Sequence, residues 1–170
     1  AERSLSRILD DAHPEQLVAG CHEIWEMACR EENHGVLREF EETFAKLTLL
    51  ADYDSSFSVR AHAAGALATL AHVPDTMAVM PVAELTRELL NSVTRSSNAD
   101  EDGEQVVWIM AALLAFTETG AGRLTFVHAG GVRATLPLLN APQPEVRRAT
   151  VVLTNSLLTV GSHVLPAEIV

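Results

Sequence analysis

The residues of this chain best suited to chemistry are a histidine and a glutamate four positions apart, His22 and Glu26. In a helix this spacing puts both side chains on one face, as in a two-ligand metal site. A metal site needs at least one more ligand, and the nearby Cys21 and Cys29 point to other sides of the same helix. The sequence has no Cys-x-x-Cys or His-x-x-x-His pattern. We therefore interpret His22 and Glu26 as an ordinary, partly exposed pair and expect no metal ion.

No other pattern in the sequence indicates an enzyme. The glycine-rich stretch around Gly120, Gly122, Gly130 and Gly131 lacks the preceding strand and the Gly-Lys-Ser/Thr ending of a phosphate-binding loop, and two helix caps explain it. There is no nucleophile elbow, and the paired acids lie in polar runs instead of an apolar cleft. We expect no catalytic residues and no cofactor.

The two cysteines indicate the compartment. Cys21 and Cys29 lie about two helical turns apart, roughly 12 Å along the axis, which is too far for a disulfide. We expect both to be buried small apolar side chains in a reducing compartment, with a cytoplasmic location preferred and a nuclear one open. The N-terminus carries charge and shows no secretory signal, and the longest uncharged stretch, 149–167, holds too many polar residues for a membrane span.

Length and composition favour one all-α domain. A chain of 170 residues can bury about 70% of its unfolded surface without metals or disulfides. Hydrophobic residues make up 48% and aromatic residues only 5%, with Ala, Leu and Val in excess, which favours closely packed helices over strands. The chain starts without Met and ends on the apolar segment 165–170, which is consistent with a piece of a longer protein.

The apolar pattern repeats along the chain. Leu17, Val59, Val106 and Val146 are equivalent positions, spaced by about 40 to 47 residues, and small or apolar residues follow most of them at four, eight and eleven positions. This period predicts a helical solenoid with units of about 1–33, 34–75, 76–119 and 120–165 within a single domain, 1–170. We expect residues 96–103, which are polar and acidic, to form a mobile surface loop. The predicted helices cover residues 14–30, 36–51, 55–72, 81–95, 104–118, 123–128, 132–139 and 144–160.

The last unit, in residues 128–139, 144–149 and 153–157, resembles an armadillo repeat. In that family a glycine pair, here Gly130 and Gly131, separates a short first helix from the second, and the third follows a proline-containing turn. Residues 59–70 resemble the third helix of such a repeat, whereas HEAT repeats, with two helices, fit the first three units equally well. The resemblance implies a right-handed α-solenoid of about four armadillo or HEAT-like units.

The resemblance also implies where a ligand lies. Ligands of these families usually lie along the inner side, which the last helix of each unit lines. Some armadillo proteins bind basic peptides there through a ladder of Asn and Trp, but of the corresponding positions only Asn155, one residue out of register, resembles a ladder member. We do not expect recognition of nuclear localisation peptides of the import-receptor type. We interpret Gly65 as a packing residue, and Trp25 and Trp108 as core side chains.

Charge indicates the kind of partner. The net charge is -11, and residues 10–54 hold twelve acids against three bases, whereas residues 123–148 hold four arginines against Glu145. An acidic surface repels nucleic acid and attracts a basic partner, although it also simply aids solubility. The candidate partner-binding residues are Glu31, Glu32, Glu39, Glu41 and Glu42, with Arg147 and Arg148 as candidates for contact with an acidic partner.

These observations predict a non-catalytic protein-interaction scaffold or adaptor that binds a basic or amphipathic segment of a partner protein. The alternative is a self-associating structural segment, in which the unfinished ends of the solenoid stack on another copy or on further repeats. A third possibility, a HEAT-like enzyme that acts on nucleic acid, requires a basic inner surface, which the composition disfavours.

Overall fold

The computed structural model describes residues 13–37, 41–51, 56–73, 76–96 and 103–159, and in these residues it contains helices and no strand. In chain order the elements are α2 (Pro14–Ala28), η1 (Glu31–Asn33), α3 (His34–Leu37), α4 (Glu41–Ala51), α5 (Phe57–Leu70), α6 (Thr76–Val79), α7 (Val82–Ser96), α8 (Gly103–Phe116), α9 (Gly120–His128), α10 (Gly131–Thr135), η2 (Leu136–Asn140) and α11 (Pro144–Thr159).

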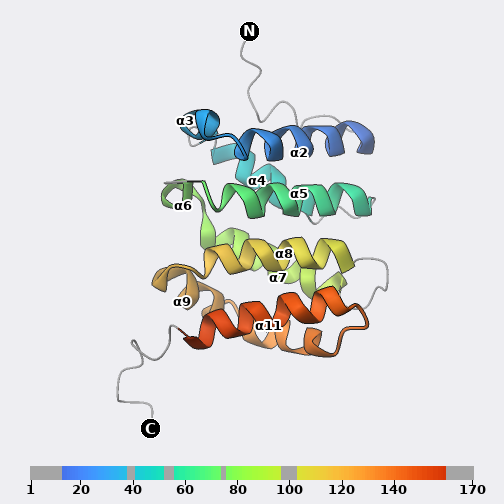
Figure 1. Cartoon of the computed structure of the whole chain (residues 1–170), viewed down its shortest axis with the longest axis vertical. Helices are drawn as coiled ribbons and strands as arrows, with labels where there is room; N and C mark the ends of the chain where they lie inside the picture. Colours follow the sequence, from blue (N-terminus) through green and yellow to red (C-terminus); the bar gives the residue numbers. More distant parts are fainter. Residues whose placement is uncertain (1–12, 38–40, 52–55, 74–75, 97–102, 160–170) are drawn as a thin grey trace.

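The four long helices α2, α5, α8 and α11 lie side by side in chain order, like the rungs of a ladder (Figure 1). Helices α4 and α7 form a second layer behind α5 and α8. A single helical unit with one apolar face cannot bury that face alone, so each unit packs on the next. Over the part of the chain that the structure describes, the fold is a right-handed α-solenoid of about four units, as the period predicts.

Local signals in the sequence set the helix boundaries. Pro14 occupies the first turn of α2, where its missing N–H costs nothing. Helices α5 and α9 begin after capping hydroxyls, since the backbone N–H of Gly122, for example, donates to Oγ1 of Thr119 at 3.0 Å. Gly130 has a φ of 80°, a left-handed conformation that glycine adopts without strain, and it separates α9 from α10. The glycine pair therefore separates a short helix from the next one, as the resemblance to an armadillo repeat implied.

Two helical segments differ from the prediction. One helix was predicted over 36–51, but the structure has two separate elements there. Helix α3 ends at Leu37 and helix α4 begins at Glu41, and residues 38–40 lie outside the described part. The short helix α6 was not predicted at all. A helix of four residues is too short to show a 3.6-residue period, so pattern reading merges or misses it. The second and third units thus have three helices each, an armadillo arrangement and not a HEAT one. The predicted loop lies mostly outside the described residues.

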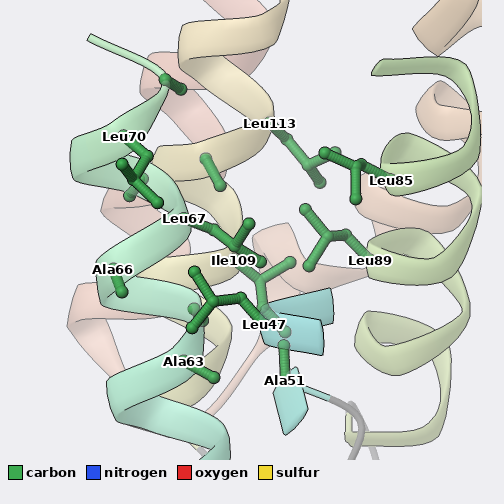
Figure 2. Close-up of a cluster of buried hydrophobic side chains, with 14 of the residues drawn as sticks. Leu47, Ala51, Ala63, Ala66, Leu67, Leu70, Leu85, Leu89, Ile109 and Leu113 are labelled. Atoms are coloured by element: carbon green, nitrogen blue, oxygen red, sulfur yellow. The ribbon is translucent and has the colours of Figure 1, made fainter. Parts of the chain in front are cut away.

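The core lies between the two layers. Fully buried leucines and isoleucines from α4, α5, α7 and α8 meet there, as Figure 2 shows for Leu47, Leu67, Leu89 and Ile109. Small residues such as Ala63 and Ala66 give α5 little side-chain bulk, so the neighbouring helices can approach it closely. The apolar excess of the sequence is thus used in helix-to-helix packing.

The cysteines were predicted correctly in one case and wrongly in the other. Cys21 is buried, and burial raises the pKa of its thiol to about 12. Cys29 is exposed, because α2 ends at Ala28 and Cys29 is its C-terminal cap. Both thiols are free. Spacing alone placed Cys29 inside a helix that stops one residue earlier.

Among the described residues, no helix combines the length and the hydropathy that crossing a lipid bilayer requires.

Candidate functional site

Helices α2, α5, α8 and α11 lie side by side in one layer (Figure 1), and we call the exposed side of this layer, opposite α4 and α7, the ladder face. Side chains from different helices meet on it. The rings of His22 on α2 and His62 on α5 lie 6.2 Å apart. Just beyond the ends of α5 and α8, Nε2 of His72 lies 3.7 Å from a carboxylate oxygen of Glu118. The ladder face is therefore a surface shared by several repeat units.

Two tryptophans lie at the middle of the ladder face. Trp25 on α2 extends across α5 to reach Trp108 on α8, and the two rings pack edge to face with centroids 4.6 Å apart. The side chain can cross α5 because the position beneath it is Gly65, where a Cβ atom would lie 2.7 Å from Cζ3 of Trp25. Gly65 thus has the packing role that was predicted. Both indoles are half-buried against the core, so each also presents part of its surface to solvent.

Because Trp25 packs on Gly65, we expect alanine at this helical position to destabilise the protein, the opposite of its usual effect. Replacing a helical glycine by alanine normally stabilises a helix by about 0.5–1 kcal/mol. Here the added methyl group overlaps the indole, and overpacking costs about 1–3 kcal/mol. We expect Gly65→Ala to lower the free energy of unfolding by about 1 kcal/mol, measured by urea denaturation.

The control for this prediction removes the indole of Trp25, which the added methyl group would overlap. In a Trp25→Leu background the same Gly65→Ala change is expected to be neutral or stabilising, because the methyl group then meets open space. A stabilising effect of Gly65→Ala in the presence of Trp25 would show that the indole contact is not maintained in solution.

Beside Trp25 the ladder face is hollowed. A shallow pocket of about 330 Å³ is lined by His22, Trp25, Glu26, Cys29 and Arg30. His22 and Glu26 form an exposed pair, with Nε2 3.4 Å from a carboxylate oxygen. Within the described ranges no three His, Cys, Asp or Glu side chains are grouped so as to hold a metal ion. The pocket therefore combines an aromatic wall with charges of both signs.

The acidic residues predicted as a partner site lie away from the ladder face. Glu31 and Glu32 are exposed in η1, and Glu42 is exposed on α4, in the layer behind α5. Glu39 lies outside the described residues, and of Glu41 the structure gives only its place at the start of α4. Glu26 lies on α2, one of the four ladder helices, and Glu118 follows the end of α8; neither was a candidate for partner binding. Counting charges along the sequence could not separate the two surfaces, because that requires the packing of the helices.

The two arginines at the start of α11 have different roles. Nη1 of Arg147 donates to the backbone oxygens of Ala141 and Pro142, at 2.6 and 2.7 Å, and so closes the turn before α11. The sequence offered no structural reason for a cation at this helix start, and these bonds supply one. Arg148 is exposed on α11, as is Asn155. Arg148 and Asn155 thus remain accessible to a partner.

No protein-family profile and no curated protein matches this sequence. Solved structures do match. The designed armadillo repeat protein YIII(Dq)4CqI superposes with a TM-score of 0.73 at 23% identity over 90% of this chain and 63% of that one. A designed armadillo repeat protein in complex with the peptide (KR)4 gives 0.76 at 21% identity, over 90% and 62%. An engineered protein gives 0.76 at 20% identity, over 90% and 60%. The chain spans about three fifths of each structure, and the likeness shows an armadillo-like repeat fold.

Proposed function

Starting from this armadillo-like fold, we propose that the chain is a non-catalytic scaffold that binds an extended basic or amphipathic segment of a partner protein along the ladder face. The observation that carries the proposal is the pair of half-buried tryptophans, Trp25 and Trp108, with the exposed carboxylate of Glu26 beside the first of them.

The chemistry of this surface suits a cationic side chain. A guanidinium or ammonium group over an indole gains about 0.5–2 kcal/mol from the π-electrons, and a nearby carboxylate adds a charge-assisted hydrogen bond. Glu26 supplies that carboxylate at one end of the face, and Glu118 supplies another beyond α8. The partly exposed Leu114 and Val107 of α8 offer apolar contacts to the intervening residues. The net charge of -11 would speed the encounter with a basic segment.

The structural neighbours support this choice of ligand. One of them was solved with the peptide (KR)4, and another is described as designed for modular peptide recognition. We extend the same kind of ligand to this chain as part of the proposal. We also propose a cytoplasmic or nuclear location, in keeping with the two free cysteines.

The proposal can be tested with the peptide (KR)4 and the chain's own fluorescence. The sequence has only two tryptophans, and both lie on the ladder face. We expect the peptide to change tryptophan emission saturably and an acidic peptide of equal length to leave it unchanged. The double variant Glu26→Lys/Glu118→Lys is expected to weaken binding by about tenfold or more, since each tenfold is 1.4 kcal/mol.

A matched charge reversal locates the site. The single variant Glu42→Lys reverses one charge on α4, in the layer behind α5, and is the control for Glu26→Lys. We expect Glu42→Lys to weaken binding by less than about threefold at physiological salt and less than Glu26→Lys does, because salt screens exposed charges beyond about 8 Å. If Glu42→Lys loses the peptide and Glu26→Lys keeps it, the ligand lies on the α4 layer and the ladder-face proposal is wrong.

A further inference from the structure

Helix α11 is the last described helix of the row in Figure 1, and one of its sides is uncovered. Its buried side, with Val146 and Leu153 2% and 1% exposed, packs toward α8. The opposite side carries four exposed residues at intervals of three or four, which therefore share a face: Arg148, Val151, Asn155 and Leu158. Val151 is 45% exposed and Leu158 is 69% exposed.

The corresponding side of α5 is built differently. With Val59 and Val146 equivalent, the four positions in α5 and its C-terminal cap are all alanine: Ala61, Ala64, Ala68 and Ala71. All four are buried, because α5 has α2 on one side and α8 on the other. Methyl groups allow the next helix to approach closely. On α11 an arginine, a valine, an asparagine and a leucine fill that space, so this side does not suit a further repeat at the interior spacing.

The uncovered surface continues onto the second layer. The tripeptide Leu-Leu-Asn occurs at 89–91 in α7 and at 138–140 in η2, which packs against α11. Leu89 and Leu138 are both buried, whereas Leu139 is 37% exposed and its equivalent Leu90 is 4% exposed. We name the whole surface the end surface; it consists of Leu139, Arg148, Val151, Asn155 and Leu158. Exposed apolar side chains that gather in this way mark an interaction site.

Arginines dominate the charge at this end of the chain. Residues 123–159 hold four arginines and one acid, Glu145. Arg123 and Arg147 donate to backbone oxygens close to them in the chain. The guanidinium of Arg148 has no hydrogen-bond or ion-pair partner among the described residues. A partner that covers the end surface removes this charge from water, and a buried charge is costly unless a counter-charge pairs with it. The partner must therefore bring a carboxylate.

We propose that the end surface binds an acidic amphipathic helix of a partner protein. A carboxylate of that helix pairs with Arg148, and its apolar side chains cover Leu139, Val151 and Leu158. The stretch of α11 from Arg148 to Leu158 is about 15 Å long, so a helix of roughly three turns covers it. Helices that dock in this way use apolar residues at i, i+3 or i+4, and i+7. The end surface of a second copy would bring another arginine and no carboxylate, so it does not match.

Fluorescence anisotropy with a labelled synthetic peptide tests the inference on the full chain. The probe is a peptide of about 16 residues with leucines along one helical face and glutamates elsewhere. Its control has the same composition in a scrambled order that gives no apolar face. We expect the probe to bind saturably and at least about tenfold more tightly than the control, because only the probe presents an apolar face. The peptide-binding proposal concerns the ladder face and a basic ligand, so either proposal can fail alone.

Two matched pairs of variants locate the binding site of the probe. Arg148→Glu is expected to weaken binding by about tenfold or more. Arg133→Glu reverses the same charge at an exposed position of α10 and is expected to weaken it by less than about threefold. Arg133 is equivalent to Glu84, which lines a groove toward α4, on the side away from the end surface.

The second pair tests the apolar contact. Val151→Asp is expected to weaken binding by about tenfold or more, whereas Val36→Asp, at an exposed position on α3 at the other end of the molecule, leaves it unchanged. Both side chains are already exposed, so the helical circular dichroism stays the same in both variants.

Three results would overturn the inference. The first is a probe that binds no more tightly than its scrambled control. The second is equal binding of the probe to the unchanged protein and to Arg148→Glu. The third is self-association in sedimentation velocity that Val151→Asp abolishes, because the end surface would then be covered by a second copy.

Discussion

Replacing Gly122 by alanine is expected to destabilise the protein by about 3 kcal/mol, among the largest effects of any single methyl group here. A Cβ atom at this position would overlap the backbone carbonyl oxygen of Phe116, at the C-terminal end of α8. Backbone cannot move aside as a flexible side chain can, so α9 must shift against α8. The same shift breaks the capping bond from the Gly122 N–H to Thr119. Urea denaturation followed by circular dichroism measures the loss.

The neighbouring glycine provides the control. Gly120 lies in the same first turn of α9, and a Cβ atom there would come no closer than 3.7 Å to a guanidinium nitrogen of Arg123. Gly120→Ala is therefore expected to leave stability unchanged or to raise it by up to about 1 kcal/mol, from helix propensity. Equal effects of the two substitutions would contradict the close approach of α8 and α9.

The second large effect is expected from Gln105, which is fully buried and links four helices. Its Nε2 donates to the backbone oxygen of Ala51 on α4 at 2.7 Å and to Oγ of Ser92 on α7 at 3.1 Å. Its Oε1 accepts a hydrogen bond from Arg60 on α5 at 2.9 Å. Because Gln105 itself lies on α8, one amide joins the second unit to the third.

Gln105→Leu keeps the volume but removes these hydrogen bonds. A buried polar group left without its partner costs about 1–3 kcal/mol, and the bond from Arg60 involves a charged group. We expect a loss of about 2–4 kcal/mol in the free energy of unfolding. Ser92 also donates to the Ala51 oxygen, at 3.1 Å, so Ser92→Ala is expected to cost less.

A matched variant separates the network from helix propensity. Glu104→Leu makes a change of similar size one residue earlier in α8, at an exposed position. We expect it to change stability by less than about 0.5 kcal/mol. A loss at Gln105 no larger than at Glu104 would mean that the network contributes nothing to the joining of the units.

Local patterns predicted the elements well because helix boundaries depend on nearby residues. Pro14, the Gly130–Gly131 pair and the hydroxyl caps act within one turn, and the apolar repeat from Val59 to Val146 needs only a spacing rule. The same reasoning failed for α6, which is too short to have a period, and for Cys29, whose exposure depends on where α2 ends.

The candidate site was harder to predict because its contacts are not local. The acidic residues at 31–42 were chosen for their charge, yet the described ones lie on η1 and α4 and not on the ladder face. Arg147 had no evident structural role until its bonds to the preceding turn were seen. Glu26 was considered only as a metal ligand beside His22, and Glu118 not at all, because nothing along the chain marks a surface that several helices share.

The sequence by itself determined the repeat, its helical character and the packing role of Gly65, since each follows from spacing and residue size along one helix. Only the tertiary structure decided that Trp25 crosses Gly65 to reach Trp108, that Gln105 joins four helices, and that α11 exposes what α5 buries. These three facts depend on how far one helix is displaced along its neighbour. A period in the sequence sets which residues face inward, but the packing of the side chains sets that displacement.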